Sequence, residues 1–206
     1  MFRPMNVLHR GTLFLCTAMA ATLVGMASAQ DAPPDMQAMM AAATPGPHHE
    51  QLAKRAGSWK AVTTMVMQPG QPPMETTGTS VLETVMDGRF LQEVTQANMM
   101  GMPWEGRGVY GYDNTKKKHI ATWYDSFGTM MMHFEGNCSG NCKTITSKSN
   151  YFDPMSKSNK TMKTVSVMHS PDKATLTMFD VAKDGTETQT GEVVYTRERK
   201  ANQANR

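Results

Sequence analysis

The sequence predicts an all-β protein, a single closed antiparallel meander barrel of about ten strands with a short N-terminal helix capping one end. Three observations support this prediction. From residue 58 onward, apolar and polar residues alternate with a period of two, which is typical of half-buried strands. Turn residues punctuate the chain at regular intervals, and Asp87-Gly88 and Asp184-Gly185 are strong hairpin signals. No segment predicts a crossover helix, so consecutive strands must pair antiparallel.

The central element is a hairpin within residues 101–128, where two strand-like runs flank the turn Asp113-Asn114-Thr115-Lys116. Its Tyr, Trp, Val, Ile and Thr residues suit a pleated, half-buried surface. The candidate strands are residues 58–68, 75–86, 89–98, 104–112, 117–126, 129–137, 142–151, 160–169, 173–181 and 186–198. Closure would remove both exposed edges, and an open sandwich is the alternative. Glycines clustered in the middle strands favour closure, because they let a sheet bend sharply.

Residues 1–29 are predicted to be a secretory signal peptide. Arg3 and Arg10 form a basic start, residues 11–26 form an apolar run, and Ala27-Ser28-Ala29 is a small-residue cleavage site. A retained membrane anchor would need an apolar stretch of about 20 residues and no cleavage site. No later run is long and apolar enough to span a bilayer. The protein is therefore expected to be periplasmic or secreted.

After cleavage, residues 30–46 form an expected flexible leader, rich in Ala, Pro and Met. The barrel domain is predicted to cover residues 47–199, beginning with a helix over 47–56, and residues 200–206 form a disordered basic tail. The cleaved chain has 19 Lys and Arg against 18 Asp and Glu, because two arginines leave with the signal, so its net charge is +1. Such a balance, with only a short basic tail, argues against a nucleic-acid partner.

Cys138 and Cys142 flank a tight turn, and in an exported protein such a pair is most simply a disulfide. The alternative, a soft-metal clamp, lacks a second ligand pair nearby. His48, His49 and Glu50 are adjacent on the predicted helix, so they point in different directions and favour a solvated face over a metal cluster. Neither a metal nor a cofactor is predicted.

Gly57-Ser58-Trp59 opens the first predicted strand, and Tyr195-Thr196-Arg197 closes the last. This arrangement resembles the calycin superfamily of lipocalin-like barrels, in which a Gly-x-Trp packs beneath a basic residue of the last strand. The resemblance implies that Trp59 and Arg197 form a structural pair at one end of the barrel. The indole would seal that end while the guanidinium stacks over it.

A closer resemblance covers almost the whole cleaved chain. It is carried by PGPHHEQLAKRAGSW, MDGRFLQEV, MGMPWEGRGVYGYDNTKKKHIATWYDSFGTMM and VVYTRER, which look like the exported bacterial family known as domain of unknown function 1579. The resemblance implies a calycin-like barrel, with no established activity and no catalytic residues. Nitrobindin-like haem barrels share this architecture and have a haem-ligating histidine late in the chain. The last histidine here, His169, lies at a predicted strand end, so haem is not carried over.

No catalytic motif is recognisable, and no enzymatic activity is expected. The sequence lacks a Gly-x-Ser-x-Gly elbow, a His-Glu-x-x-His pair and a phosphate-cradling glycine loop. A triad drawn from Ser58 or Ser126 with His119 and Asp125 fails, because adjacent Asp125 and Ser126 point to opposite faces of a strand. A buried acid pair involving Glu93 or Glu105 is conceivable, but charge on a strand more often faces outward.

The aromatic and methionine residues predict a binding cavity inside the barrel. The expected wall residues are Trp104, Tyr110, Trp123, Met130 and Met132. Aromatic walls, flexible Met side chains and a few polar groups are typical of small-molecule sites. The predicted function is non-enzymatic binding of a small, mostly apolar ligand.

Two alternatives remain open from the sequence. Two methionine clusters, residues 99–102 and 130–132 beside His133, could handle copper in a redox role, since thioethers are soft ligands. Alternation along the strand splits the second cluster between the two faces, which favours a core or cavity role. The other alternative is a structural envelope protein whose barrel is filled by its own side chains.

Overall fold

The computed structural model of the chain describes residues 33–66 and 70–199. The chain divides into two compact units, Met1–Gln37 and Ala38–Arg206, and the strands all lie in the second. The predicted signal peptide (1–29) and basic tail (200–206) lie outside the described residues. Within the described part of the chain, none of the helices has the length and apolar character needed to cross a membrane.

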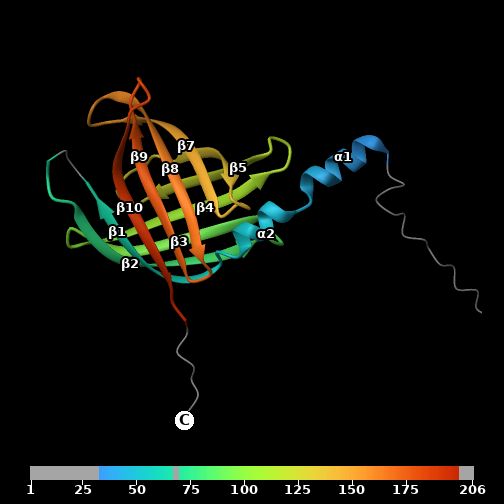
Figure 1. Ribbon diagram of the computed structural model, residues 1–206, viewed down its shortest axis with the longest axis horizontal. Helices are drawn as coiled ribbons and strands as arrows, with labels where there is room; N and C mark the ends of the chain where they lie inside the picture. The colour runs from blue at the N-terminus through green and yellow to red at the C-terminus, as the bar shows by residue number, and fades with distance from the viewer. Residues whose placement is uncertain (1–32, 67–69, 200–206) are drawn as a thin grey trace, which may run out of the picture. The chain divides into compact units, whose positions relative to one another are not determined.

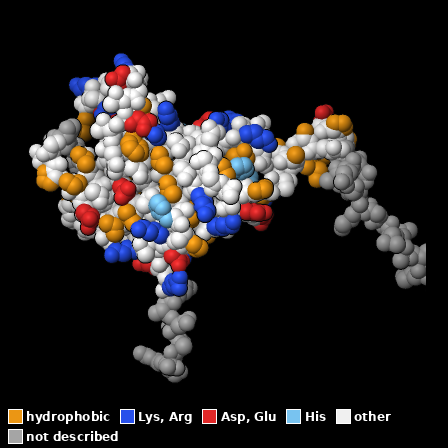
Figure 2. Space-filling view, viewed as in Figure 1, with side chains coloured by type: hydrophobic (Ala, Val, Ile, Leu, Met, Phe, Trp, Pro, Cys, Tyr) orange, Lys and Arg blue, Asp and Glu red, His pale blue; other side chains and the backbone are white. Residues whose placement is uncertain are grey.

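Ten antiparallel strands form a closed barrel, as the sequence predicts (Figure 1). Each strand pairs with the next along the chain, and β1 pairs with β10 to close the ring. The strands are β1 (Gly57–Met65), β2 (Met74–Val85), β3 (Phe90–Met99), β4 (Met102–Asp113), β5 (Lys118–Asp125), β6 (Met132–Ser139), β7 (Thr144–Asp153), β8 (Ser158–Ser170), β9 (Lys173–Val181) and β10 (Glu187–Arg197). Closure pairs the backbone groups of both edge strands, which an open sheet would leave free. On the face shown in Figure 2, basic and acidic side chains are interspersed.

Among the described residues, two short helices precede the barrel. Helix α1 (Pro34–Ala43) lies within the segment expected to be a flexible leader, and no helix was predicted there. Its Ala and Met residues are good helix formers, and Asp35 complements the positive end of the helix. None of its residues is buried. A helix that buries no face carries no apolar periodicity, and the sequence pattern therefore could not reveal it.

Helix α2 (Pro47–Ala53) contacts β3 and β4 at one end of the barrel (Figure 1). Pro47 suits its first turn, and the backbone N–H of Gly46 donates a hydrogen bond to His49 Nδ1 over 3.0 Å. Leu52 is buried in the hydrophobic core with Trp59, Leu82 and Leu91. The helix thus anchors its last turn in the barrel. It ends three residues earlier than predicted, and residues 54–56 form a turn instead.

Trp59 of β1 and Arg197 of β10, the two strands that close the barrel, hold this turn in place. They face each other across β1 and β10, and the Arg197 guanidinium carbon lies 4.1 Å from the Trp59 ring centroid. Arg197 donates hydrogen bonds to the carbonyl oxygens of Lys54 (2.9 Å) and Ala56 (2.6 Å). Trp59 Nε1 donates to the carbonyl oxygen of Arg55 over 2.9 Å. Three consecutive carbonyl groups are therefore held by two side chains.

Gly57 makes the close approach of Arg197 possible. Its φ of +133° lies where L side chains are strained, and a Cβ atom there would collide with Arg197 Nη1. The Gly-x-Trp sequence therefore has a direct physical basis. The glycine leaves space for the guanidinium, and the tryptophan provides the surface on which it stacks.

Replacing Arg197 with lysine should destabilise the barrel by about 2–3 kcal/mol, because a single ammonium cannot reproduce the guanidinium fork that bonds several carbonyl groups. Urea unfolding measures this loss. Arg199→Lys is the matched control, since that side chain is 80% exposed and should change stability by less than about 0.5 kcal/mol. Equal losses in the two variants would contradict the role given to Arg197.

Candidate binding cavity

A cavity of about 320 Å³ occupies the interior of the barrel. Its wall is made by the inward-facing residues of the strands together with Leu52 and Arg55, which enter from α2 and the turn that follows it. Most of the lining is apolar, and methionines contribute from several strands. The methionines are Met65, Met99, Met132, Met162, Met168 and Met178. The volume lies at the lower end of the range of about 300–1,000 Å³ that is usual for small-molecule pockets.

Four of the five side chains predicted for the wall line this cavity: Trp104, Tyr110, Trp123 and Met132. Met130 does not line it and is 42% exposed. The prediction for Met130 was wrong because strand β6 begins only at Met132, so the inward alternation does not extend back to residue 130. Strand boundaries of this kind are not marked in the sequence by a turn signal.

Two glycines in β4 make room for the aromatic side chains of the wall. A Cβ atom at Gly106 would collide with the indoles of Trp104 and Trp123, whose ring centroids are 6.3 Å apart. A Cβ atom at Gly108 would lie 2.7 Å from the hydroxyl oxygen of Tyr110. The aromatic rings therefore lie over backbone that carries no side chain.

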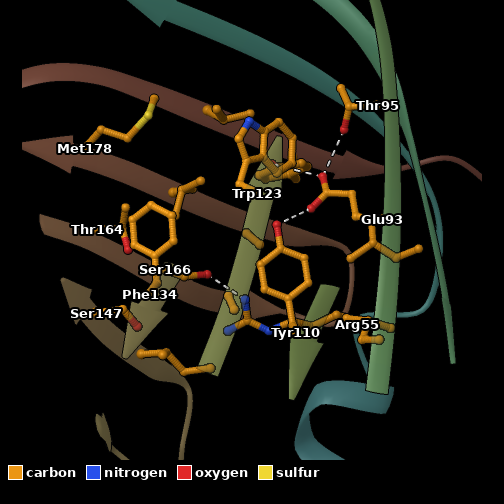
Figure 3. Close-up of a pocket in the computed structure, with 18 of the residues that line it drawn as sticks. Arg55, Glu93, Thr95, Tyr110, Trp123, Phe134, Ser147, Thr164, Ser166 and Met178 are labelled. Carbon is orange, nitrogen blue, oxygen red and sulfur yellow. Dashed lines mark hydrogen bonds between the residues drawn. The ribbon is translucent and has the colours of Figure 1, made fainter. Parts of the chain in front are cut away.

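Glu93 is buried inside the barrel and accepts four hydroxyl hydrogen bonds, of which those from Thr95 and Tyr110 can be followed in Figure 3. Its donors are Ser80 (2.6 Å), Thr95 (3.0 Å), Tyr110 (2.6 Å) and Tyr195 (3.3 Å). Burial is the largest cause that raises the pKa of Tyr110 and of Tyr195 well above the usual value, and the Glu93 charge adds to it. Both phenols therefore keep their protons and remain donors. A buried carboxylate with this many partners is a satisfied acceptor.

Arg55 is a cationic side chain of the cavity wall, which also includes the acidic residues Glu93 and Asp125 (Figure 3). Its Nη1 donates to Ser166 Oγ over 2.5 Å, whereas its buried Nη2 has no hydrogen-bond partner among the described residues. Burial lowers the pKa of this guanidinium, and the nearby Tyr110, Tyr195 and Glu93 oppose that effect. Because arginine keeps its proton even in protein interiors, Arg55 presents an unpaired cationic donor.

Four potential metal ligands converge beside the cavity: His48, His119, Cys138 and Cys142. One ligand atom from each lies within 4.8 Å of all the others. The sulfurs of the two cysteines are 1.99 Å apart, at disulfide distance. The expectation that no second ligand pair lies near the cysteines was therefore wrong.

The two histidines of α2 were expected on a solvated face of the helix, but both pack against other parts of the protein. His49 is buried and accepts the hydrogen bond from Gly46, while His48 stacks on Tyr112 with ring centroids 3.9 Å apart. His119 lines the cavity and is 4% exposed. Burial, followed by the charges of His48 and other neighbours, lowers the pKa of His119 to about 4, so its imidazole is neutral at neutral pH.

Sequence reasoning favoured an outward position for Glu93 and did not place Arg55 in the interior. A usable signal existed for Glu93, because it shares the inward period of β3 with Leu91 and Thr95, which are also buried. The outward position was wrong because the usual preference of charged side chains for solvent was given more weight than the alternation along β3. Arg55 carries no such signal, since it lies in a turn. Glu105 and Arg107, by contrast, form a partly exposed ion pair with a 2.7 Å contact.

A closed antiparallel barrel of ten strands around one mostly apolar cavity of small-molecule size is the class that the fold and site define. The chain belongs to the family described as protein of unknown function DUF1579, whose profile matches residues 44–197. No curated protein matches the chain.

Several solved structures match the chain. Rv2717c from M. tuberculosis has a TM-score of 0.51 and 16% sequence identity, and the match covers 76% of this chain and 100% of that chain. A redesigned beta barrel, b11L5F_LGL, has a TM-score of 0.38 and 13% identity, over 72% of this chain and 95% of that one. EF1p2_mFAP2b bound to DFHBI has a TM-score of 0.39 and 13% identity, over 74% and 98%. The likeness to Rv2717c shows the fold alone.

Replacing Gly108 with alanine should destabilise the barrel by about 1–3 kcal/mol, because the added methyl group displaces Tyr110 from Glu93. Urea unfolding gives the stability, and near-ultraviolet circular dichroism reports the tyrosine environment. Gly128→Ala is the control, since the nearest atom to a Cβ there is 3.9 Å away and the effect should stay below about 0.5 kcal/mol. A neutral Gly108→Ala variant would contradict the packing described for Tyr110.

Proposed function

We propose that this protein binds a small, mostly apolar ligand with an anionic head group inside the barrel, without transforming it. One observation carries the proposal. A buried guanidinium, that of Arg55, presents an unpaired N–H group at the wall of a largely apolar cavity. Leaving a buried charged donor without a partner is costly, and a ligand that accepts from it would remove that cost.

The apolar lining suits the body of such a ligand. Trp104, Trp123 and Phe134 give flat hydrophobic surface, and methionine side chains adapt to irregular shapes. A barrel filled by its own side chains, the structural alternative, does not account for the open volume of about 320 Å³.

The polar groups suit an anionic head. The Arg55 guanidinium has the planar fork that matches a carboxylate. Glu93 is the acid near it, but no ion pair joins these two residues in the described structure, and four hydroxyl groups already satisfy the carboxylate. Glu93 therefore offsets the charge of Arg55 without occupying its free donor.

The methionine clusters give less support to copper handling. Met99 is buried in the cavity wall, whereas Met100 and Met102 are 61% and 51% exposed. Met131 is likewise exposed while Met132 lines the cavity. Each cluster thus divides between the inside and the outside of the barrel. Export through the predicted signal peptide would place ligand binding outside the cytoplasm.

Decanoate and decanol test the proposal, because they share an apolar chain and differ in the charge of the head. Tryptophan fluorescence should report binding of both, since Trp104 and Trp123 line the cavity. Arg55→Met should weaken decanoate about 10- to 100-fold and leave decanol nearly unchanged, as expected for a charge-assisted hydrogen bond of about 1.5–3 kcal/mol.

Arg89→Met is the matched control, since Arg89 is outside the cavity lining and should affect neither probe. Native mass spectrometry of the purified protein provides a second measurement and should reveal a co-purified anionic lipid-like molecule. An Arg55→Met variant that binds decanoate as well as the original protein would overturn the assignment of the head group. A cavity that is empty on purification and binds neither probe would overturn the function itself.

A further inference from the structure

We propose that His48, His119, Cys138 and Cys142 form a tetrahedral Zn²⁺ site when the two cysteines are reduced. The four residues come from α2, β5, β6 and the turn between β6 and β7. Their ligand atoms converge within 4.8 Å of one another although the histidines and cysteines are far apart in the sequence. Two thiolates and two imidazoles are a usual donor set for structural zinc.

The distances from His48 to the two sulfurs fit this coordination, and the sulfurs themselves separate when the disulfide is reduced. Typical Zn–N and Zn–S bonds of about 2.0 and 2.3 Å place N and S ligand atoms about 3.5 Å apart in a tetrahedral site. His48 Nδ1 lies 3.6 Å from Cys138 Sγ and 3.2 Å from Cys142 Sγ. The spacing Cys-x-x-x-Cys is also within the range of zinc-binding turns.

His119 supplies an independent observation. Its side chain is 4% exposed, and neither ring nitrogen has a hydrogen-bond partner in the described structure. A buried imidazole without partners is unfavourable, and one of its nitrogens is directed into the cluster formed with His48 and the two sulfurs. A metal ion bound there would satisfy that nitrogen.

The neighbouring aromatic residue holds both histidines in place. The Tyr112 ring stacks on His48, with an angle of 9° between the rings, and meets His119 edge-on at 5.0 Å between centroids. His48 lies in the first turn of α2, and this helix contacts β3 and β4. Such restraint would reduce the entropic cost of assembling four ligands.

The oxidation state of the cysteines controls the site. An external dithiol reduces the Cys138–Cys142 disulfide by thiol–disulfide exchange, so the S–S bond breaks, two thiols form and the dithiol becomes a disulfide. Zn²⁺ then displaces the two thiol protons and bonds to two thiolates and two neutral imidazoles. The oxidised pair has no thiolate to offer, and the two forms are therefore mutually exclusive.

The test uses the full chain carrying Cys16→Ser, which leaves Cys138 and Cys142 as its only thiols. After anaerobic reduction with a phosphine, Zn²⁺ is titrated against a chromophoric chelator and Co²⁺ is titrated in parallel. The expected result is one equivalent of either metal per reduced chain and none per oxidised chain. The Co²⁺ form should show the visible bands of tetrahedral cobalt and a thiolate-to-cobalt charge-transfer band.

Variants assign the nitrogen ligands. His48→Gln and His119→Gln should each weaken Zn²⁺ binding at least about 100-fold, whereas His133→Gln, at an exposed histidine, should have no effect. Circular dichroism checks that each variant folds. If a histidine variant does not fold, the Co²⁺ spectrum of the chain that keeps all four ligands still tests the site. A reduced chain that binds no metal, or an octahedral cobalt spectrum, would overturn the proposal. Folded histidine variants with unchanged affinity would do the same.

Discussion

The contact between Trp59 and Arg197 is the constraint on which the rest of the structure depends. It joins the first and last strands, so it forms only when the barrel has closed. The same two side chains bind the carbonyl groups of residues 54–56, the turn that leads from α2 into β1. Closure of the ring and placement of the turn after α2 therefore depend on the same two side chains. The buried position of Arg55 follows, because its backbone is held while its side chain extends into the barrel.

Residues without side chains and residues with large aromatic side chains together shape the interior of the barrel. Gly106 and Gly108 leave the inner surface of β4 open, and Trp104, Trp123 and Tyr110 cover it. The rings narrow the barrel without filling it. Tyr110 also reaches Glu93, and the network of hydroxyl groups around that carboxylate makes a buried acid tolerable in an apolar wall. Residues of β4 and its neighbour β3 thus determine both the shape of the cavity and the position of its buried carboxylate.

The sequence predicts the fold well because hairpins are local. Turn signals such as Asp87-Gly88 and period-two alternation involve residues close together in the chain, and they indicate ten antiparallel strands without any knowledge of the rest. The same alternation predicts the cavity wall correctly wherever a strand is continuous. The prediction fails at Met130, because that residue precedes the start of β6. Contacts made across the closed ring are different. His48 meets Cys138 and Cys142 across 90 and 94 residues, and no local pattern encodes that meeting.

Helix α2 links the two candidate sites physically. Leu52 and the following Arg55 line the cavity, while His48, one turn earlier, faces the cysteine pair. His119 belongs to both sites, since it lines the cavity and is part of the metal-ligand cluster. A metal ion held by His48 and His119 would tie α2 to β5 and so restrain the helix that carries Leu52. The redox state of the two cysteines would thereby act on α2, the seven-residue helix whose first turn carries His48 and whose last turn carries Leu52.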